Sequence, residues 1–360
     1  MRKKRLSKWM LLASAVMVVV LVAAACGGEE EEEAAVAPTA TSPAPTATSV
    51  TEEKGLIRIA ENDWTGNFVD INLAKIILEE EMGYDVELIF ADYTAQWVAL
   101  EAGDLDVVME IWPSYSIGQM EEFLAEEGGS GSVVSQEPMG IIGTTGYWVF
   151  TYVIEGDPER GIEATAPDLV DWTDLNQYKD LFKTPESGDK GRWVGAPVVG
   201  WAAHDEERVA NLGLEYEHVY LGSEAALFAE IDSYYTRGEP LLFYMWAPHW
   251  IPAKYEITRI PLPAYTDECW GYVEGVDPTF ACDFPTDITF NIANPDWIEE
   301  NPEAAQFFRN FNLSNDDQNK MILAVDIDEV PIEQAVRQWM AENEDIWTAW
   351  IPFLGLDSGS

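Results

Sequence analysis

Residues 56–111 read LIRIAENDWTGNFVDINLAKIILEEEMGYDVELIFADYTAQWVALEAGDLDVVMEI. Between short apolar runs, apolar residues recur at helical spacing over 68–82, and a second, shorter helix is predicted to end at Gly103. The apolar runs themselves predict three strands, over 56–60, 86–90 and 105–111. A β-α-β-α-β order indicates the α/β class, with a parallel sheet covered by helices.

The chain beyond this unit shows a second, smaller α/β pattern. Strands are predicted over 193–199 and 240–246, with a helix over 223–235 between them. Segments 146–153 and 257–263 are predicted to cross between the two parts, and two crossings form a hinge around which lobes close on ligands. The predicted lobes are residues 55–147 together with 262–360, and residues 148–261.

The N-terminus has the form of an export signal. A basic segment at 2–5 precedes an apolar run at 11–25 that is shorter than an ordinary membrane span. The run ends at Cys26, followed by two glycines, and resembles a bacterial lipoprotein signal, although Ala23 stands where leucine is preferred. We expect residues 1–25 to be a signal peptide and Cys26 to be lipidated. A short uncleaved anchor is the alternative, and either places the domain outside the cytoplasmic membrane.

The next segment and the overall charge bear on the partners of the chain. Residues 26–54 are rich in Glu and then in Ala, Pro and Thr, so they cannot build a core and are predicted to be a disordered tether. The formal net charge of −45 argues against binding nucleic acid or anionic lipid. It is compatible with drawing cations near the surface, although solubility alone also explains it.

The chain has three cysteines, Cys26, Cys269 and Cys282. If Cys26 is lipidated, the other two remain as an even pair in an oxidising compartment, and we expect them to form a disulfide. Two free buried thiols are the alternative. The three histidines of the chain show no metal-ligand spacing, and we expect neither a metal nor a cofactor.

Trp112, Trp201 and Trp246 each stand at the end of an apolar run, close to Pro or Gly, where a strand passes into a loop. Ligands of open α/β sheets bind beyond the carboxyl ends of strands. Indole faces gathered there can enclose a permanent cation through cation–π attraction, although large aromatics also fill cores. Since Trp112 belongs to one predicted lobe and the other two to the second, an occupant touching all three would favour closure.

Other tryptophans follow a different pattern near the C-terminus. From residue 332 onward, Trp339, Trp347 and Trp350 belong to one apolar stripe at helical spacing. We therefore predict that these three rings are part of the core.

The chain resembles the glycine betaine/proline betaine solute-binding proteins of ABC importers, the ProX/OpuAC type, over most of residues 55–350. The resemblance rests on the order and spacing of short elements: NDWTG at 62–66, GDLDV at 103–107, GYWV at 146–149, GW at 200–201 and YMWAPHW at 244–250. It implies a two-lobed fold like the type II periplasmic binding proteins, with hinge crossings. It also implies a monomeric, lipid-anchored receptor without catalysis that delivers a quaternary ammonium compound to a membrane permease with a cytoplasmic ATPase.

In that family, aromatic side chains wrap the trimethylammonium group, while backbone amides and a polar side chain bind the carboxylate. The resemblance assigns the cage to Trp112, Trp201 and Trp246. It assigns the binding of the ligand carboxylate to the backbone N–H groups of Ala202 and Ala203.

Four further side chains are candidates for the site. Trp64 and Trp148 are candidate walls, with core packing as the alternative. In that family a side chain shortly after Trp112 often assists the carboxylate; here Tyr115 and Ser116 stand there instead of a His or Arg, and His204 is a candidate from the other lobe. Glu110 could place negative charge near the pocket and favour choline over betaine, unless it is only a solvated or hydrogen-bonded residue at the end of a strand.

Three alternative functions remain open at this point. Choline, carnitine or another amine could be the ligand of the same fold. A secreted carbohydrate-active enzyme would use paired carboxylates, but HExxH, CxxC, GxSxG and Walker motifs are all absent. A sugar receptor needs many hydrogen-bonding side chains, whereas Ala202 and Ala203 follow Trp201.

Overall fold

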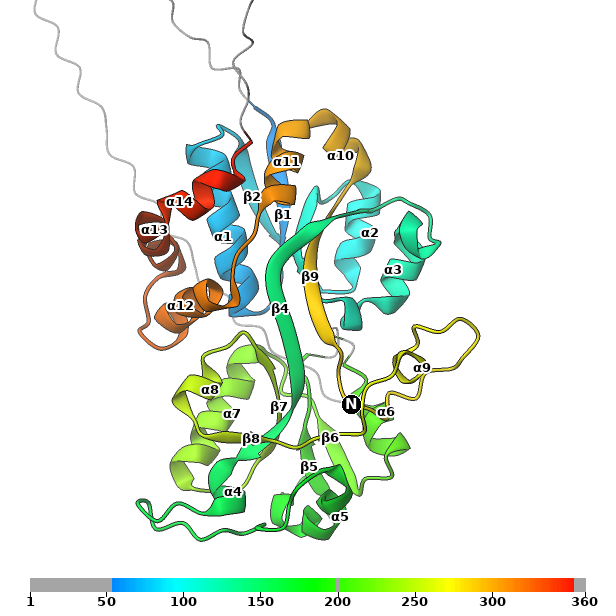
Figure 1. Ribbon diagram of the computed structural model, residues 1–360, viewed down its shortest axis with the longest axis vertical. Helices are drawn as coiled ribbons and strands as arrows, with labels where there is room; N and C mark the ends of the chain where they lie inside the picture. Colours follow the sequence, from blue (N-terminus) through cyan, green and yellow to red (C-terminus); the bar gives the residue numbers. More distant parts are fainter. Residues whose placement is uncertain (1–53, 199–200, 202, 353–360) are drawn as a thin grey trace, which may run out of the picture. The chain divides into compact units, whose positions relative to one another are not determined.

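The computed structural model in Figure 1 describes residues 54–198, 201 and 203–352. The predicted lipidation site Cys26, the signal peptide, the tether up to residue 53 and Ala202 lie outside the described residues. In the part of the chain that is described, no helix is both long and apolar enough to cross a membrane.

A mixed sheet with the order β2-β1-β3-β9-β4-β7-β5-β6 organises the described residues, and β8 pairs with β4 at its side. Strand β1 (Leu56–Glu61) is parallel to both β2 (Asp85–Phe90) and β3 (Val107–Ile111). The parallel sheet expected at the N-terminus is therefore present. The sequence analysis missed β9 (Thr286–Ala293), which pairs with β3 in the antiparallel sense.

The long strand β4 (Val134–Phe150) connects the two α/β parts in Figure 1. Its first part pairs with β9, and its last part pairs with β7 (Leu242–Ala247) and β8 (Ile257–Arg259). Beyond β7 lie β5 (Gly191–Val194) and β6 (Tyr216–Val219), all three parallel. We call the part built on β1, β2 and β3 the first lobe, and the part built on β5, β6 and β7 the second lobe.

The crossing predicted over 146–153 is only the end of β4, because α4 begins at Thr151. The earlier part of β4 reads VSQEPMGIIGTT over 134–145, without regular alternation and with a proline and two glycines, so the sequence signal for a strand there is weak. The predicted lobe limits at 147/148 and 261/262 remain a prediction. They fall inside β4 and between β8 and β9.

Helices cover the sheet, and several begin or end where the sequence predicts. Helix α2 ends at Gly103 in the left-handed conformation, at φ 75°, which glycine adopts without strain. Ser223 caps the helix predicted over 223–235, since its side chain accepts a hydrogen bond from the Ala226 N–H. The helices of the first lobe are α1 (Thr65–Glu80), α2 (Ala95–Ala102), α3 (Ile117–Phe123), α10 (Pro295–Glu300), α11 (Pro302–Asn310), α12 (Asn315–Asp326), α13 (Ile332–Glu342) and α14 (Glu344–Trp347). The other helices are α4 (Thr151–Glu155), α5 (Leu175–Tyr178), α6 (Asp205–Asn211), α7 (Glu224–Arg237), α8 (Ile251–Lys254) and α9 (Asp267–Trp270).

The C-terminal helices pack against α1. Trp339, Trp347 and Trp350 are buried in the core there, as the apolar stripe predicts, and the rings of Trp339 and Trp350 stack at 6.1 Å between centroids. The helical spacing of apolar residues therefore identified a core face correctly.

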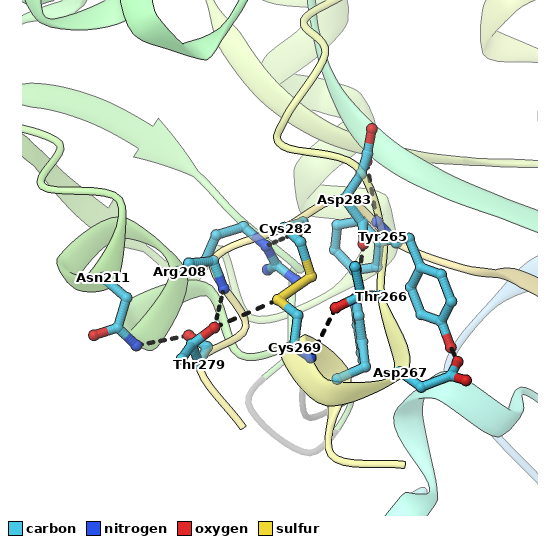
Figure 2. Close-up of a disulfide and its surroundings, with 12 residues drawn as sticks. Arg208, Asn211, Tyr265, Thr266, Asp267, Cys269, Thr279, Cys282 and Asp283 are labelled. Carbon is cyan, nitrogen blue, oxygen red and sulfur yellow. Dashed lines mark hydrogen bonds between the residues drawn. A yellow bond between two sulfur atoms is a disulfide. The ribbon is translucent and has the colours of Figure 1, made fainter. Parts of the chain in front are cut away.

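A disulfide joins Cys269 and Cys282 beside α6 (Figure 2). The loop that it closes is held to this helix by hydrogen bonds. The Arg208 Nε donates to the Cys282 carbonyl at 3.3 Å, and the Asn211 side-chain amide donates to the Thr279 carbonyl at 2.6 Å. The crosslink thus closes a loop rich in Gly, Asp and Pro, and the hydrogen bonds from Arg208 and Asn211 attach this loop to α6.

Candidate ligand-binding site

Aromatic side chains from both lobes enclose a cavity of about 30 Å³. A single water needs less space than this, so the cavity has room for a compact group. Its lining consists of Trp64, Tyr93, Trp112, Tyr115, Trp201, Tyr244 and Trp246. None of these side chains carries a charge at neutral pH. The cavity therefore offers π surface and a few hydroxyl groups to an occupant.

The tryptophans of the two lobes meet around this cavity. Trp64 of the first lobe and Trp201 of the second pack edge to face, with centroids 5.8 Å apart and planes at 85°. Trp201 and Trp246 repeat that geometry at 5.3 Å and 84°. Edge-to-face packing is favourable for aromatic pairs. It also surrounds the cavity with rings in different orientations, as the enclosure of a roughly spherical group requires.

Glu110 lies behind two of these rings. It adopts a left-handed conformation, φ 64°, where the register between β3 and β9 shifts. Its Oε2 accepts a hydrogen bond from Trp64 Nε1 at 2.9 Å, and its Oε1 accepts one from Trp112 Nε1 at 3.2 Å. Burial raises the pKa of Glu110 to about 7, and the hydrogen bonds from the two tryptophans oppose that rise. One carboxyl group thus orients two cage rings that come from different loops.

The tyrosine hydroxyls of the cage are engaged in hydrogen bonds of their own. The Tyr93 hydroxyl accepts the backbone N–H of Trp112 at 2.7 Å. The Tyr115 hydroxyl lies 2.7 Å from that of Tyr244 and donates to Thr145 Oγ1 at 2.9 Å. Burial raises the pKa of Tyr93, Tyr115 and Tyr244, so these hydroxyls stay protonated. These bonds hold the rings in place around the cavity.

Gly143 of β4 is a positioning residue that the sequence analysis missed. A Cβ atom at this position would lie 2.1 Å from Cζ3 of Trp112. The Trp112 ring therefore packs directly on the β4 backbone, and only glycine leaves room for it. Glycine in a strand often marks such a close approach, which is the signal that could have identified it.

The structure places the predicted site residues in different environments. Trp64, Trp112, Trp201 and Trp246 line the cavity. Trp148 is not among the lining residues, and the guanidinium of Arg259 lies 5.7 Å from its ring centroid. Trp148 follows Tyr147, whose ring lies 6.1 Å from that of the lining residue Tyr244, and consecutive residues of a strand point to opposite faces.

The residues predicted for a carboxylate also separate. His204 does not line the cavity: its ring stacks on Phe280 at 3.6 Å, and burial lowers its pKa to about 4. Ala203 is buried, and its carbonyl accepts a hydrogen bond from Arg208 Nη1 at 2.7 Å. Ala202 lies outside the described residues.

Tyr244 lines the cavity although the sequence analysis did not select it. It precedes Trp246 by two residues on β7, and residues at that spacing share one face of a strand. The alternation of a strand was therefore a usable signal for Tyr244.

A group of hydrogen bonds joins the lobes beside the cavity; we call Thr65, Glu224, Trp250 and Asp326 the lobe-contact cluster. Glu224 Oε2 of α7 accepts the backbone N–H of Thr65, at the start of α1, at 2.9 Å. Trp250 Nε1 donates to Asp326 Oδ2 of α12 at 2.7 Å, and the Thr65 hydroxyl donates to Asp326 Oδ1 at 2.9 Å. These contacts stabilise the arrangement in which the rings of both lobes meet.

The described residues contain no group of three or more His, Cys, Asp or Glu side chains that could hold a metal ion.

Residues 55–342 match the OpuAC family, the substrate-binding domain of ABC-type glycine betaine transport systems. The chain belongs to this family. Its members are binding proteins rather than enzymes, and the chain is accordingly a substrate-binding component of an ABC transporter.

Named proteins and a solved structure are similar to this OpuAC-family chain. The trimethylamine N-oxide-binding protein of Pelagibacter ubique (strain HTCC1062) is 28% identical over 305 residues, which cover 82% of this chain and 91% of that protein. The glycine betaine/proline betaine-binding periplasmic protein of Salmonella typhimurium (strain LT2) is 24% identical over 207 residues, covering 53% of this chain and 62% of that protein. The crystal structure of ProX from Borrelia burgdorferi superposes with a TM-score of 0.65 at 20% identity, covering 83% of this chain and 97% of the other. The last comparison shows the two-lobed α/β fold of periplasmic binding proteins.

Proposed function

We propose that this chain binds a quaternary ammonium compound, such as glycine betaine, in the seven-ring cavity and delivers it to an ABC permease with a cytoplasmic ATPase. The observation that carries the proposal is the lining of the cavity, which is entirely aromatic and comes from both lobes. A trimethylammonium group has no N–H to donate, so π surface replaces hydrogen-bond acceptors as its partner. Trp112, Trp201 and Trp246 would form the core of the cage, with Trp64 as a further wall.

Closure would follow from the same contacts. An occupant that touches Trp64 and Trp112 from the first lobe and Trp201 and Trp246 from the second gains all its contacts only when the lobes meet. The lobe-contact cluster would then add its hydrogen bonds to the closed form. For a ligand carboxylate, the backbone N–H groups after Trp201 remain our proposed partners.

Trimethylamine N-oxide is the second candidate ligand. It is favoured by the name of the relative that aligns with 82% of this chain and by the small volume of the cavity. Choline and carnitine are further members of the same ligand class.

Calorimetric titration of the purified full chain tests this function. Glycine betaine, trimethylamine N-oxide, choline and carnitine are the ligands, and maltose is the control. We expect saturable binding of at least one ammonium compound and no binding of maltose. Failure of all four to bind correctly folded protein, or binding of maltose with comparable affinity, would contradict the proposal.

We also propose that the chain is anchored on the extracytoplasmic face of the membrane through a lipid on Cys26, after removal of residues 1–25. The basic and apolar pattern of the N-terminus supports this, as does the word "periplasmic" in the name of the Salmonella relative. Expressed in bacterial cells, the Cys26→Ser variant should leave the membrane fraction. Retention in the membrane would favour an uncleaved anchor instead.

A further inference from the structure

Two buried carboxyl groups lie together behind the cage. Asp70 of α1 and Glu110 of β3 are 0% and 1% exposed. No Lys, Arg or His is among the main causes of the raised pKa of either group, and no ion pair of the described residues involves Asp70 or Glu110. The Gln318 side-chain amide of α12 donates to Asp70 Oδ2 at 2.9 Å. Burying two negative charges side by side without a cation is costly, so the pair must hold a proton.

The hydrogen bonds indicate where that proton lies. Both oxygens of Glu110 already accept hydrogen bonds from indole N–H groups, which suits a carboxylate. Asp70 Oδ1 is buried and receives no hydrogen bond from the described residues. A proton on this oxygen makes it a donor, and the Glu110 carboxyl is close enough to raise the pKa of Asp70 through its charge and through hydrogen bonding. Asp70 therefore carries the shared proton, and Glu110 carries the charge.

We propose that Asp70 and Glu110 form a proton-sharing pair that sets the charge of the cage wall, so that uptake of a quaternary ammonium group below neutral pH releases a proton. This inference rests on the proposed function. In acid, Glu110 also becomes protonated and the pair is neutral. When the ligand enters, the proton on Glu110 passes to solvent, and the resulting carboxylate keeps the hydrogen bonds from Trp64, Trp112 and the Asp70 carboxyl.

Electrostatics gives the direction of the coupling. Burial, together with the neighbouring acid, raises the pKa of Asp70 well above its ordinary value, and burial raises that of Glu110 to about 7. A permanent positive charge one ring away from Glu110 stabilises its carboxylate and lowers its pKa in the complex. By linkage, affinity must then rise with pH up to the pKa of the free protein and level off above it.

Few other groups near Asp70 and Glu110 change their protonation state over the same pH range. Gln318 of α12 faces Asp70, and the Asn291 amide of β9 accepts the Glu110 backbone N–H at 3.3 Å; neither amide titrates. Tyr93, which precedes α2, is an ionisable hydroxyl near Glu110, and its raised pKa keeps it neutral.

The carboxyl pair also affects the indole rings of the cage. An indole that donates its N–H to an anion becomes richer in electrons, which strengthens its attraction for a cation.

Titration calorimetry of the full chain with choline and with glycine betaine tests the inference, since both keep their charge over the range used. Measurements at about pH 5.5 and about pH 8, each in two buffers of different ionisation heat, count the protons exchanged. We expect choline affinity to fall by up to about tenfold per pH unit below the pKa of Glu110, with release of up to about one proton per ligand. Constant affinity without proton exchange would overturn the inference while leaving the proposed function intact.

Two variants sharpen the test. Asp70→Asn replaces the carboxylic acid that donates to Glu110 with a weaker amide donor, so Glu110 ionises at higher pH and the proton release moves to higher pH. Asp283→Asn removes a different carboxyl of raised pKa, which pairs with Arg259 at 2.8 Å beside the disulfide and belongs neither to the cage nor to the lobe-contact cluster, and should keep the proton release of the unchanged protein. Loss of proton release in Asp283→Asn would overturn our assignment of the coupling to Asp70 and Glu110. If Asp70→Asn does not fold, the number of protons released by the unchanged protein still decides whether the inference holds. Absence of binding at every pH would overturn the proposed function and this inference with it.

Discussion

The indole of Trp112 lies on the backbone of Gly143, so closely that a Cβ atom on Gly143 would come within 2.1 Å of Trp112 Cζ3. Trp112 follows β3, whereas Gly143 lies in β4 on the other side of β9. The position of this cage ring is therefore set by a strand that is not its sheet neighbour.

Gly143→Ala should displace the Trp112 ring and weaken ligand binding by at least about tenfold, because the cage loses a wall and Glu110 loses a hydrogen-bond donor. Calorimetric titration measures the loss. Gly118→Ala in α3 is a matched control: a Cβ atom there meets nothing within 4 Å, and alanine suits a helix better than glycine. Unchanged affinity in Gly143→Ala would show that Trp112 does not contact the ligand.

Trp246→Ala should cost more than about 1 kcal/mol of binding free energy, the range of a desolvated cation–π contact. Trp347→Phe, in the C-terminal core, should lower the melting temperature and leave affinity nearly unchanged. Both effects are read from one calorimetric titration and one thermal melt per variant. Equal affinity losses in the two variants would indicate general destabilisation rather than a cage.

Trp250→Phe should speed ligand release, because it removes the N–H that Trp250 donates to Asp326 across the lobe contact. A hydrogen bond to a charged group contributes about 1.5–3 kcal/mol, so we expect the dissociation rate to rise by roughly tenfold or more. Stopped-flow tryptophan fluorescence follows the release. Trp297→Phe is the control, since the Trp297 N–H is buried without a hydrogen-bond partner among the described residues. A release rate equal to that of the control would show that this hydrogen bond does not hold the lobes together.

Stability should fall as pH rises above about 6.5. Burial raises the pKa of Asp70, Glu110 and Glu224 in the folded chain, so the native state binds more protons than the unfolded chain, and deprotonation destabilises it. Burial lowers the pKa of His204 to about 4 and of His249 to about 3, so these histidines make stability rise with pH instead. Their effect on stability is confined to pH values below the ordinary histidine pKa of about 6.5. Melting temperatures between about pH 6.5 and pH 8.5, without ligand, measure the slope. A melting temperature that rises over this interval would contradict the assignment of these carboxyl groups as buried acids.

The strand ends at which two of the cage tryptophans lie could be predicted from the sequence. Trp112 and Trp246 follow or end apolar runs, and the runs did become β3 and β7. The sequence could not place β9, because a strand that returns to the first lobe from the far end of the chain has no local signal of its partner. Trp148 shows a similar limit at the site, since the sequence alone does not tell which face of β4 is turned toward the cavity.

The sequence by itself determined the α/β class and selected Trp112, Trp201 and Trp246, which line one cavity, because these follow from apolar periodicity and from residue types at the ends of strands. Only the tertiary structure decided that Glu110 stands behind Trp64 and Trp112 and that Asp70 stands beside it. It also decided that Gly143 makes room for a ring and that Trp64 meets Trp201. These relationships join residues far apart in the chain. They arise from the order of strands in the sheet and the meeting of the lobes, which no local pattern encodes.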